Sequence, residues 1–581
     1  MGTDLTGGRV TRVSGALVEI EGVAHIAMSE LVALGDSRLL GEVVAIRGSA
    51  ITVQAYEYTG GLAVGDPAVA VGRPLSVRLG PDLLGGVFDG LLRPLTAAPV
   101  WLRPDVEHEG PPTTWTWHAS VVPGATVAQG TVLGTVTRDG REAGPVEHRV
   151  LAPAGASGQV DWLADNGPRG LADPLARVAG AVVAMCSYWP VRRARPSRER
   201  VGTREPLLTG QRVLDAVFPV ALGSSAAVPG GFGTGKTMLL QQMAKWCTAD
   251  VIVYVGCGER GNEMADVLVE LGELSDPRTG RRLAERIVVI ANTSNMPMMA
   301  REACIYTGVT VAEYYRDMGY HVVVIADSTS RWAEALREFG SRLGELPAEE
   351  GYPANLSSEL AAFYERAGYV DTLGGDIGSV TVLGAVSPPG GDLSEPVTVH
   401  TERFVRCRWS LDRDLAYSRH YPAVSWSASF SRDAEGLGTA RIAAGDDTGW
   451  SARRARVLDL LTESDRLAAL TELVGVTALP DSERMVLVAG RLLREAVLAQ
   501  NAQNPNDAHC GQVKTAALVD AVLAVIDTCR ELVAGGVAAQ LIEETDFGKL
   551  IRARDDTGPD DTAVVVQRRN QIVQTLHELP R

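Results

Sequence analysis

The segment from Gly230 to Thr237, GGFGTGKT, restricts the fold of this 581-residue chain more than any other stretch. It matches the pattern G-x-x-x-x-G-K-[S/T], with a short apolar strand (226–228) before it and a helical stretch after it. In that setting the glycines let the backbone curl so that successive N–H groups point inward, and the helix adds the positive end of its dipole. The segment therefore predicts a phosphate-binding loop in an α/β domain.

The lysine of this segment is unusual for the chain. Lys236 is one of only four lysines, against a combined 55 lysines and arginines. A compact ammonium fits a narrow phosphate nest, whereas the planar fork of arginine fits it poorly. We expect Lys236 to contact the β- and γ-phosphates and the Thr237 hydroxyl to bind Mg²⁺. The loop residues predicted to bind nucleotide are Gly230, Gly231, Phe232, Gly233, Thr234, Gly235, Lys236, Thr237 and Met238.

A second segment, HVVVIADSTSR (321–331), supplies a candidate metal ligand. Its apolar strand ends in Asp327, so the carboxylate emerges at the carboxyl edge of the sheet, where open α/β sheets bind ligands. We expect Asp327 to bind Mg²⁺ together with Thr237. An ordinary helix cap is the alternative role for Asp327.

A third segment, VIVYVGCGERGNEM (251–264), presents Glu259 and Arg260 after an apolar strand and a glycine-flanked turn. A carboxylate at such a strand end can polarise a water molecule that attacks the γ-phosphate. Arg260 would then add positive charge near a phosphate or fix the glutamate. The spacing alone also allows a plain surface ion pair.

The pattern along the chain predicts a multidomain protein. Short alternating strands separated by glycines open the chain, and apolar residues at helical spacing close it, as in 455–475 and 482–500. We expect an N-terminal β-barrel over 1–75, a linker over 76–112, a β-rich insertion over 113–187, a connector over 188–208, an α/β nucleotide-binding domain over 209–440 and a C-terminal α-helical domain over 441–581.

The α/β assignment depends on a repeated order of strand, turn and helix. Continuously apolar, β-branched strands are expected at 226–229, 251–257, 286–292, 321–327, 379–386 and 405–411. Strands of this kind form parallel sheets that helices cover on both faces. The basic segment 188–200 is expected to be a solvated connector into this domain, with a nucleic-acid patch as the alternative.

Composition excludes several classes of function. A net charge of −16 argues against a protein whose main role is to coat nucleic acid or an anionic membrane. The seven cysteines include no C-x-x-C pair, which favours free thiols over a metal site or a disulfide framework. No apolar run approaches the ~20 residues that span a bilayer, so we expect any membrane association to come through partner proteins.

The phosphate loop, GCGERGNEM (256–264) and ADSTSRWAEALRE (326–338) follow one another in an order that is highly specific. Together they resemble the catalytic A (alpha) subunit of V-type and archaeal-type rotary ATPases, of a bacterial kind. The resemblance extends over most of the chain, through 208–223, 349–356, 378–398 and 415–426. It implies a RecA-like nucleotide domain, and the β-rich insertion is similar to the extra domain of A subunits.

The resemblance also implies an activity: hydrolysis or synthesis of ATP, with ATP/ADP and Mg²⁺ as cofactors, coupled to H⁺ or Na⁺ transport. Glu259 would activate the attacking water, and Arg260 and Arg331 would lie near the phosphates. Three copies would alternate with non-catalytic B subunits, which supply an arginine finger, and would work with central and peripheral stalks and a membrane rotor. The implied location is peripheral, on the cytoplasmic side of the cell membrane, with no nucleic-acid partner.

Two positions depart from the family pattern. The family usually encloses the adenine base with two aromatic residues; Tyr421 matches one of them, but Gln503 stands in place of the other. Losing one stacking face costs roughly 1 kcal/mol of base binding, unless Gln503 hydrogen-bonds the base instead. Glu359 stands where the family usually has arginine, which reverses a charge near an expected subunit interface.

Three other functions fit parts of the sequence. The N-terminal barrel and basic connector suit a RecA-like hexameric nucleic-acid translocase, although the net charge of −16 opposes it. A binding-only ring subunit would commonly lack the loop lysine or the glutamate, and both are present. A secretion-type ATPase would lack the β-rich insertion.

Overall fold

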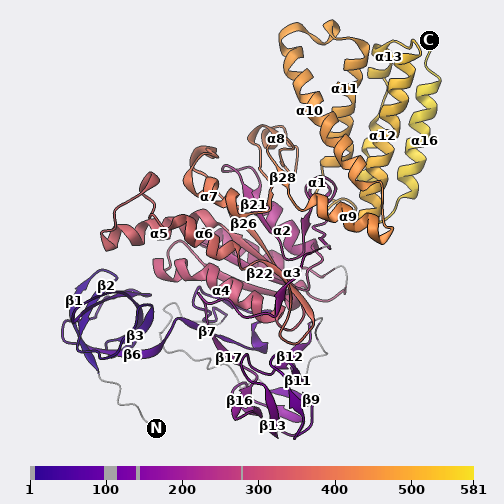
Figure 1. The fold of residues 1–581 in the computed structure, drawn as a ribbon. Coiled ribbons are helices and arrows are strands. Elements are labelled where there is room, and N and C mark those ends of the chain that lie inside the picture. The colour runs from indigo at the N-terminus through magenta and orange to yellow at the C-terminus, as the bar shows by residue number, and fades with distance from the viewer. Residues whose placement is uncertain are drawn as a thin grey trace. The chain divides into compact units, whose positions relative to one another are not determined.

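The computed structural model describes residues 7–96, 114–138, 144, 146–203, 205–276 and 279–580 (Figure 1). These residues fall into two compact units. The first comprises Met1–Gly202 with Ala249–Gly384, and the second comprises Thr203–Thr248 with Ala385–Arg581. Residues 97–112 of the expected linker and residues 113, 139–143 and 145 of the expected insertion lie outside the described residues.

The first unit begins with a closed barrel of antiparallel strands in the order β1-β2-β5-β4-β3-β6 (indigo in Figure 1). Alternating side chains point inward, so that Val18 and Ile20 of β2 are fully buried while Glu21 is exposed. Closure leaves no open sheet edge. The expected N-terminal barrel is confirmed, with strands β1 (Gly8–Ser14), β2 (Leu17–Glu21), β3 (Glu30–Leu34), β4 (Leu39–Arg47), β5 (Ala50–Ala55) and β6 (Pro67–Pro74).

The β-rich insertion consists of two four-stranded sheets, β10-β13-β15-β16 and β12-β11-β9-β14. Trp117, Leu133 and Leu175 are fully buried in the core of the insertion. The expected β structure is confirmed, with strands β9 (Trp115–Ala119), β10 (Thr126–Val127), β11 (Val132–Arg138), β12 (His148–Leu151), β13 (Gly158–Leu163), β14 (Gly167–Arg169), β15 (Pro174–Val178) and β16 (Ala181–Ala184).

The linker and the connector contain more strand than the sequence indicates. The linker contains a short helical turn, η1 (Pro81–Leu83), and its strand β7 (Ser76–Leu79) pairs with β17 (Ser187–Pro190). The two-residue strand β8 (Val87–Phe88) joins the edge of the parallel sheet. In the connector, β18 (Glu199–Arg200) pairs with β25 (Gly368–Asp371). These strand pairings attach the linker and the connector to the rest of the first unit.

The parallel strands of the first unit form the order β26-β24-β22-β23-β8, and β25 adds antiparallel to β26. Every residue of β22 and β23 is buried, as expected for strands between two helical layers. This confirms the α/β assignment. The strands are β22 (Val251–Cys257), β23 (Ile287–Asn292), β24 (His321–Asp327) and β26 (Ile377–Val386), with helices α3 (Gly261–Glu273), η2 (Leu283–Arg286), α4 (Met298–Arg316), α5 (Thr329–Leu343), η3 (Glu349–Gly351) and α6 (Leu356–Tyr364).

The second unit carries the phosphate loop between β21 (Ser225–Pro229) and α2 (Lys236–Trp246). The strand expected over 405–411 is shorter in the structure. Strand β27 covers only Cys407–Arg408, and the chain then continues to α8 (Arg413–Tyr417). Leu411 still donates a 2.8 Å hydrogen bond to the carbonyl of Pro229. The other elements are β19 (Pro206–Leu207), α1 (Arg212–Val217), β20 (Val220–Ala221), η4 (Pro389–Gly391), α7 (Pro396–Phe404) and β28 (Phe430–Ser431).

The C-terminal part is helical, as expected, and its first helix begins at Ala434 (orange to yellow in Figure 1). Among the described residues, no helix combines the length and the apolarity needed to cross a membrane. The helices are α9 (Ala434–Ala444), α10 (Trp450–Val474), η5 (Val476–Ala478), α11 (Asp481–Leu492), the π-helical turn η6 (Leu493–Leu498), α12 (Gln512–Ala534), α13 (Ala539–Glu543), α14 (Gly548–Ile551), α15 (Ala553–Asp556) and α16 (Ala563–His577).

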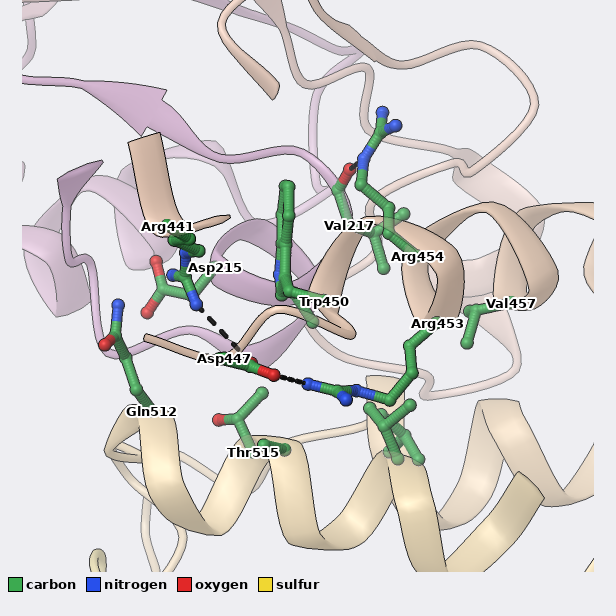
Figure 2. A pocket seen from close by; sticks show the side chains of 14 residues that line it. Asp215, Val217, Arg441, Asp447, Trp450, Arg453, Arg454, Val457, Gln512 and Thr515 are labelled. Atoms are coloured by element: carbon green, nitrogen blue, oxygen red, sulfur yellow. Dashed lines mark hydrogen bonds and ion pairs between the residues drawn. The ribbon is translucent and has the colours of Figure 1, made fainter. Parts of the chain in front are cut away.

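A small cavity lies among α1, α10 and α12 of the second unit (Figure 2). Asp447 forms ion pairs there with Arg441 and Arg453, and Arg454 donates a hydrogen bond to the Val217 carbonyl. The cavity volume is about 30 Å³, which accommodates one or two water molecules. The cavity is therefore too small to hold a nucleotide.

Candidate nucleotide-binding and catalytic site

The phosphate loop has the curled backbone that the sequence predicts. Gly233 and Gly235 have φ angles of 78° and 89°, in the left-handed region that favours glycine. A Cβ atom at Gly230 would lie 2.8 Å from the Cβ of Leu411, so only glycine fits there as well. Thr234 closes the turn by donating a 2.8 Å hydrogen bond to the carbonyl of Gly231. Three of the loop glycines are thus required by conformation or space.

Helix α2 begins at Lys236, and no side chain caps its N-terminus. The first turn carries no acidic residue, so the positive end of the helix dipole is not offset there. The Lys236 ammonium donates hydrogen bonds of 2.6 and 2.9 Å to the carbonyls of Gly230 and Gly231. Thr237 is half-buried, whereas Met238 and Phe232 are 52% and 92% exposed. The arrangement suits an anion at the loop.

The two candidate base-binding residues lie in the same unit as the loop. A Cβ atom at Gly235 would lie 3.5 Å from Cε1 of Tyr421, so the tyrosine ring borders the phosphate loop. The segment that carries Gln503 is joined to Tyr421, because the Gln500 N–H donates a 2.7 Å hydrogen bond to the Tyr421 carbonyl. Gln503 itself is exposed. The structure therefore brings the loop and the two segments into one neighbourhood.

In the first unit, Glu259 and Asp327 lie at the carboxyl ends of adjacent strands. Gly256 of β22 is in register with Asp327 of β24, and Glu259 follows three residues later. Gly258 has a φ of 72°, and a Cβ atom there would lie 2.8 Å from the Cβ of Arg331. The glycine thus permits a close approach of this strand end to α5. The structure therefore brings Glu259, Asp327 and Arg331 together at this edge of the first unit.

The carboxyl of Glu259 titrates far from its ordinary range. Burial raises its pKa to about 8, the charge of Asp327 and the hydrogen-bonded carboxyl of Glu263 act in the same direction, and Arg331 opposes them. A carboxyl with a pKa near neutrality can hold or accept a proton at working pH, as a general base must. Strongly perturbed carboxyls of this kind concentrate at functional sites.

Asp327 is buried, with 3% of its surface exposed, and accepts a 3.1 Å hydrogen bond from the phenol of Tyr254. Burial and the charge of Asp327 raise the pKa of Tyr254 well above its usual range, so the phenol stays a neutral donor. Among the described residues, no group of three or more His, Cys, Asp or Glu side chains could bind a metal alone. Mg²⁺ commonly uses one or two protein oxygens and takes the rest from phosphate and water. The Asp327 carboxylate offers such an oxygen in the first unit, and the Thr237 hydroxyl offers another in the second unit.

The two arginines differ in their surroundings. Arg260 is exposed and precedes the first residue of α3. Arg331, half-exposed in the first turn of α5, pairs through Nη1 with both carboxylate oxygens of Glu334 at 3.0 Å. If Arg331 contacts a phosphate, that contact replaces its ion pair with Glu334.

Glu359, the position where the charge is reversed, lies half-buried on α6. Its Oε2 accepts a 2.7 Å hydrogen bond from the phenol of Tyr306, and Asn355 donates to Oε1 at 3.4 Å. The negative charge is therefore stabilised within the first unit.

Sequence reasoning missed Glu263 and Tyr254. Glu263 lies four residues after Glu259 on the first turn of α3, and Tyr254 lies within the buried strand β22. For Glu263, the one signal in the sequence is its helical spacing from Glu259. Tyr254 gives no signal, because a tyrosine in an apolar strand is ordinarily a core residue.

Four family models match consecutive parts of the chain. They describe the β-barrel domain of the ATP synthase alpha/beta family (residues 10–72), the alpha/beta subunit barrel-sandwich domain (111–192), the nucleotide-binding domain (210–431) and the C-terminal domain of V and A type ATP synthase (442–537).

Among solved structures, the ATPase EscN of the type III secretion system of enteropathogenic E. coli is similar in fold. The TM-score is 0.64 at 20% sequence identity, and the match covers 89% of this chain and 100% of that chain.

Curated relatives match over nearly the full length. A V-type ATP synthase alpha chain of Anaeromyxobacter dehalogenans is 49% identical over 555 residues, covering 94% of both chains. The A subunit of the A-type ATP synthase of Haloferax volcanii is 44% identical over 580 residues, covering 98% of both chains. A V-type ATP synthase alpha chain of Nitrosococcus oceani is 47% identical, covering 94% of this chain and 93% of the relative. The chain therefore belongs to the family of V-type ATP synthase alpha chains and A-type ATP synthase A subunits.

Proposed function

We propose that this chain is the catalytic subunit of a V/A-type rotary ATPase, hydrolysing or synthesising ATP in coupling to H⁺ or Na⁺ transport. The observation that carries the proposal is the placement of Glu259 and Asp327 at the carboxyl ends of adjacent strands, where Gly258 closely approaches Arg331. The raised pKa of Glu259 supports it. The same chain holds a glycine-shaped phosphate loop with Lys236. Family membership favours this function over the nucleic-acid translocase and the binding-only ring subunit.

The phosphate loop binds the β- and γ-phosphates. Backbone N–H groups of the loop and of the first turn of α2 point toward the phosphate oxygens, and Lys236 adds a full positive charge. In the structure the ammonium binds the carbonyls of Gly230 and Gly231. Phosphate oxygens replace these carbonyls as acceptors, so Lys236 is held near its working position before the nucleotide arrives.

The Thr237 hydroxyl and the Asp327 carboxylate would hold Mg²⁺, which would supply positive charge against the phosphates. The Tyr254 phenol orients the Asp327 carboxylate through its hydrogen bond. Tyr421 stacks on one face of the adenine base, and Gln503 hydrogen-bonds its edge.

Glu259 accepts a proton from the water molecule that attacks the γ-phosphorus. The new bond joins the water oxygen to that phosphorus, and the bond from the γ-phosphorus to the bridging oxygen breaks, which leaves ADP and inorganic phosphate. Arg260 and Arg331 add positive charge where negative charge accumulates on the phosphoryl oxygens. Synthesis uses the same groups in reverse order.

As a member of the family, the chain is one part of a multisubunit complex. We propose that three copies alternate with non-catalytic B subunits, each of which supplies an arginine finger, and that central and peripheral stalks join this ring to the membrane rotor. The chain then acts at the cytoplasmic side of the cell membrane through its partners. It needs no nucleic acid, in keeping with a net charge of −16.

The test is ATP hydrolysis by the assembled complex. We expect Glu259→Gln to lower kcat about 10²–10⁴-fold, because a general base is removed. Lys236→Ala removes a preorganised cation and should lower kcat at least about 10²-fold. Matched controls are Glu273→Gln, exposed at the end of α3, and Lys549→Ala, exposed on α14. Undiminished turnover after either site substitution would refute the mechanism.

A further inference from the structure

Two segments without helix or strand carry the residues that the proposed function assigns to the base. Tyr421 follows α8, and Gln503 lies between η6 and α12. Tyr421 is 43% exposed and Gln503 is exposed. An exposed side chain on an irregular segment gives a directed contact only if its backbone is fixed, because fixing each residue costs conformational entropy. The buried contacts beneath residues 499–511 are therefore informative.

Gln500 joins the two segments to the start of the nucleotide-binding part. It is buried, and its N–H donates to the Tyr421 carbonyl at 2.7 Å. Its side-chain oxygen accepts from the Arg212 N–H at 2.9 Å, and its amide nitrogen donates to the Gly210 carbonyl at 2.9 Å. The main-chain N–H and both polar side-chain atoms of Gln500 thus hold its segment against Tyr421 and against residues 210–212.

An ion pair with no solvent exposure lies under the same loop. Nη1 of Arg212 is 2.5 Å from Oδ1 of Asp507, and both side chains are 0% exposed. Arg212 also donates through Nε to the Val497 carbonyl at 2.7 Å and through Nη2 to the Ala499 carbonyl at 2.5 Å. The guanidinium therefore holds the chain at both ends of the loop.

A short relay leads from this ion pair to Gln503. The second carboxylate oxygen of Asp507 accepts the Asn501 N–H at 2.6 Å. The side-chain oxygen of Asn501 accepts the Gln503 N–H at 3.0 Å. Asp507 is thereby connected to the Gln503 backbone through Asn501, although its own side chain is not exposed to solvent.

Lys514 fixes the far side of the loop. Its buried ammonium donates to the carbonyls of Asn506, Arg554 and Thr557 at 2.8, 2.8 and 2.9 Å. The residue before Asp507 is therefore held as firmly as Asp507 itself.

We infer that Asp507, held by Arg212, is a positioning residue that sets the base contact of Gln503 through Asn501 and so determines base affinity and selectivity. The inference rests on the proposed function, because it concerns the same nucleotide. It assigns no part of the phosphate chemistry to this network.

The chemistry of the network supports positioning rather than stability alone. A buried ion pair often adds little stability compared with apolar residues of the same volume, because desolvation offsets the attraction. Its directional hydrogen bonds, however, fix one geometry. Here those hydrogen bonds lead through Asn501 to the exposed Gln503, which departs from the family pattern. The network can therefore position Gln503.

The primary test is Asn501→Ala in the assembled complex. The substitution removes one acceptor from an exposed side chain and leaves the ion pair intact. We expect the KM for ATP to rise about fivefold, as for the loss of one hydrogen bond, while kcat changes less than about twofold. Inhibition by inorganic triphosphate, which has no base, should be unchanged, and the preference for ATP over GTP should fall.

Three variants complete the test. Asn501→Asp keeps the acceptor and should restore the KM for ATP. Asn504→Ala removes a similar acceptor on the same loop, one that binds the Asn506 N–H instead, and should leave the KM unchanged. Asp507→Asn should act in the same direction as Asn501→Ala.

The outcomes separate two failures. An unchanged KM in Asn501→Ala, or an equal rise in Asn504→Ala, would overturn the positioning role while the wild-type complex still hydrolyses ATP. A wild-type complex that does not hydrolyse ATP would instead refute the proposed function. A loss of triphosphate binding in Asn501→Ala would also contradict the inference, because the network would then act on the phosphates.

Discussion

At the scale of single residues, the half-buried Glu259 shows how a strand end raises the pKa of the carboxyl that we propose as the catalytic base. Three causes raise its pKa to about 8: burial first, then the charge of Asp327, then Glu263. Only the ionised form can accept a proton from water. Since kcat/KM reports the free enzyme, we expect kcat/KM for ATP to increase with pH through a midpoint near 8.

The neighbours of Glu259 give this prediction a control. Glu263→Gln removes one cause that raises the pKa of Glu259, so the midpoint should move to lower pH. Arg331→Gln removes the group that lowers it, so the midpoint should move to higher pH, whatever happens to the rate. Glu338→Gln, on the exposed face of α5, should leave the pH midpoint unchanged. Midpoints that stay fixed in the first two variants would show that Glu259 is not the titrating group.

At the scale of elements, the connector binds the barrel to the α/β part of the first unit. The guanidinium of Arg192 pairs with both oxygens of Glu302 on α4 at 2.7 Å and reaches Glu42 of the barrel strand β4 at 3.5 Å. Tyr306 lies beneath it, with the guanidinium carbon 5.4 Å from the ring centre. The expected solvated connector is therefore also a structural junction.

This junction predicts a large effect on stability. Arg192→Ala leaves two buried carboxylates without their cation, so we expect the free energy of unfolding to fall by about 3 kcal/mol. Arg193→Ala, at the exposed neighbouring position, should change it by less than about 0.5 kcal/mol. Chemical denaturation of both variants beside the wild type measures the difference. Equal losses in the two variants would show that the ion pairs contribute nothing specific.

Sequence patterns predicted the elements whose signal is local. The phosphate loop is encoded within eight consecutive residues, and Asp327 and Glu259 follow uninterrupted apolar strands. The strands β7 and β8 were missed because they are four and two residues long and have no periodicity of their own. The domain boundaries over 1–75, 76–112, 113–187, 188–208, 209–440 and 441–581 remain a prediction.

At the scale of the whole molecule, the features that sequence could not supply are contacts between distant positions. Arg212 and Asp507 are 295 residues apart, and neither lies in a pattern that indicates an ion pair. The close approach of Gly258 to Arg331 likewise depends on how the strand end meets α5. Such contacts follow from tertiary packing, whereas the chemistry of the phosphate loop and that of the two acidic strand ends follow from short segments.

We propose that the molecule cleaves ATP with Glu259 as the base that activates water. The most direct measurement is a single turnover of bound ATP by the assembled complex containing Glu259→Gln. We predict that this complex retains ATP and releases phosphate about 10²–10⁴-fold more slowly than the wild type. Release of phosphate at the wild-type rate would contradict the claim.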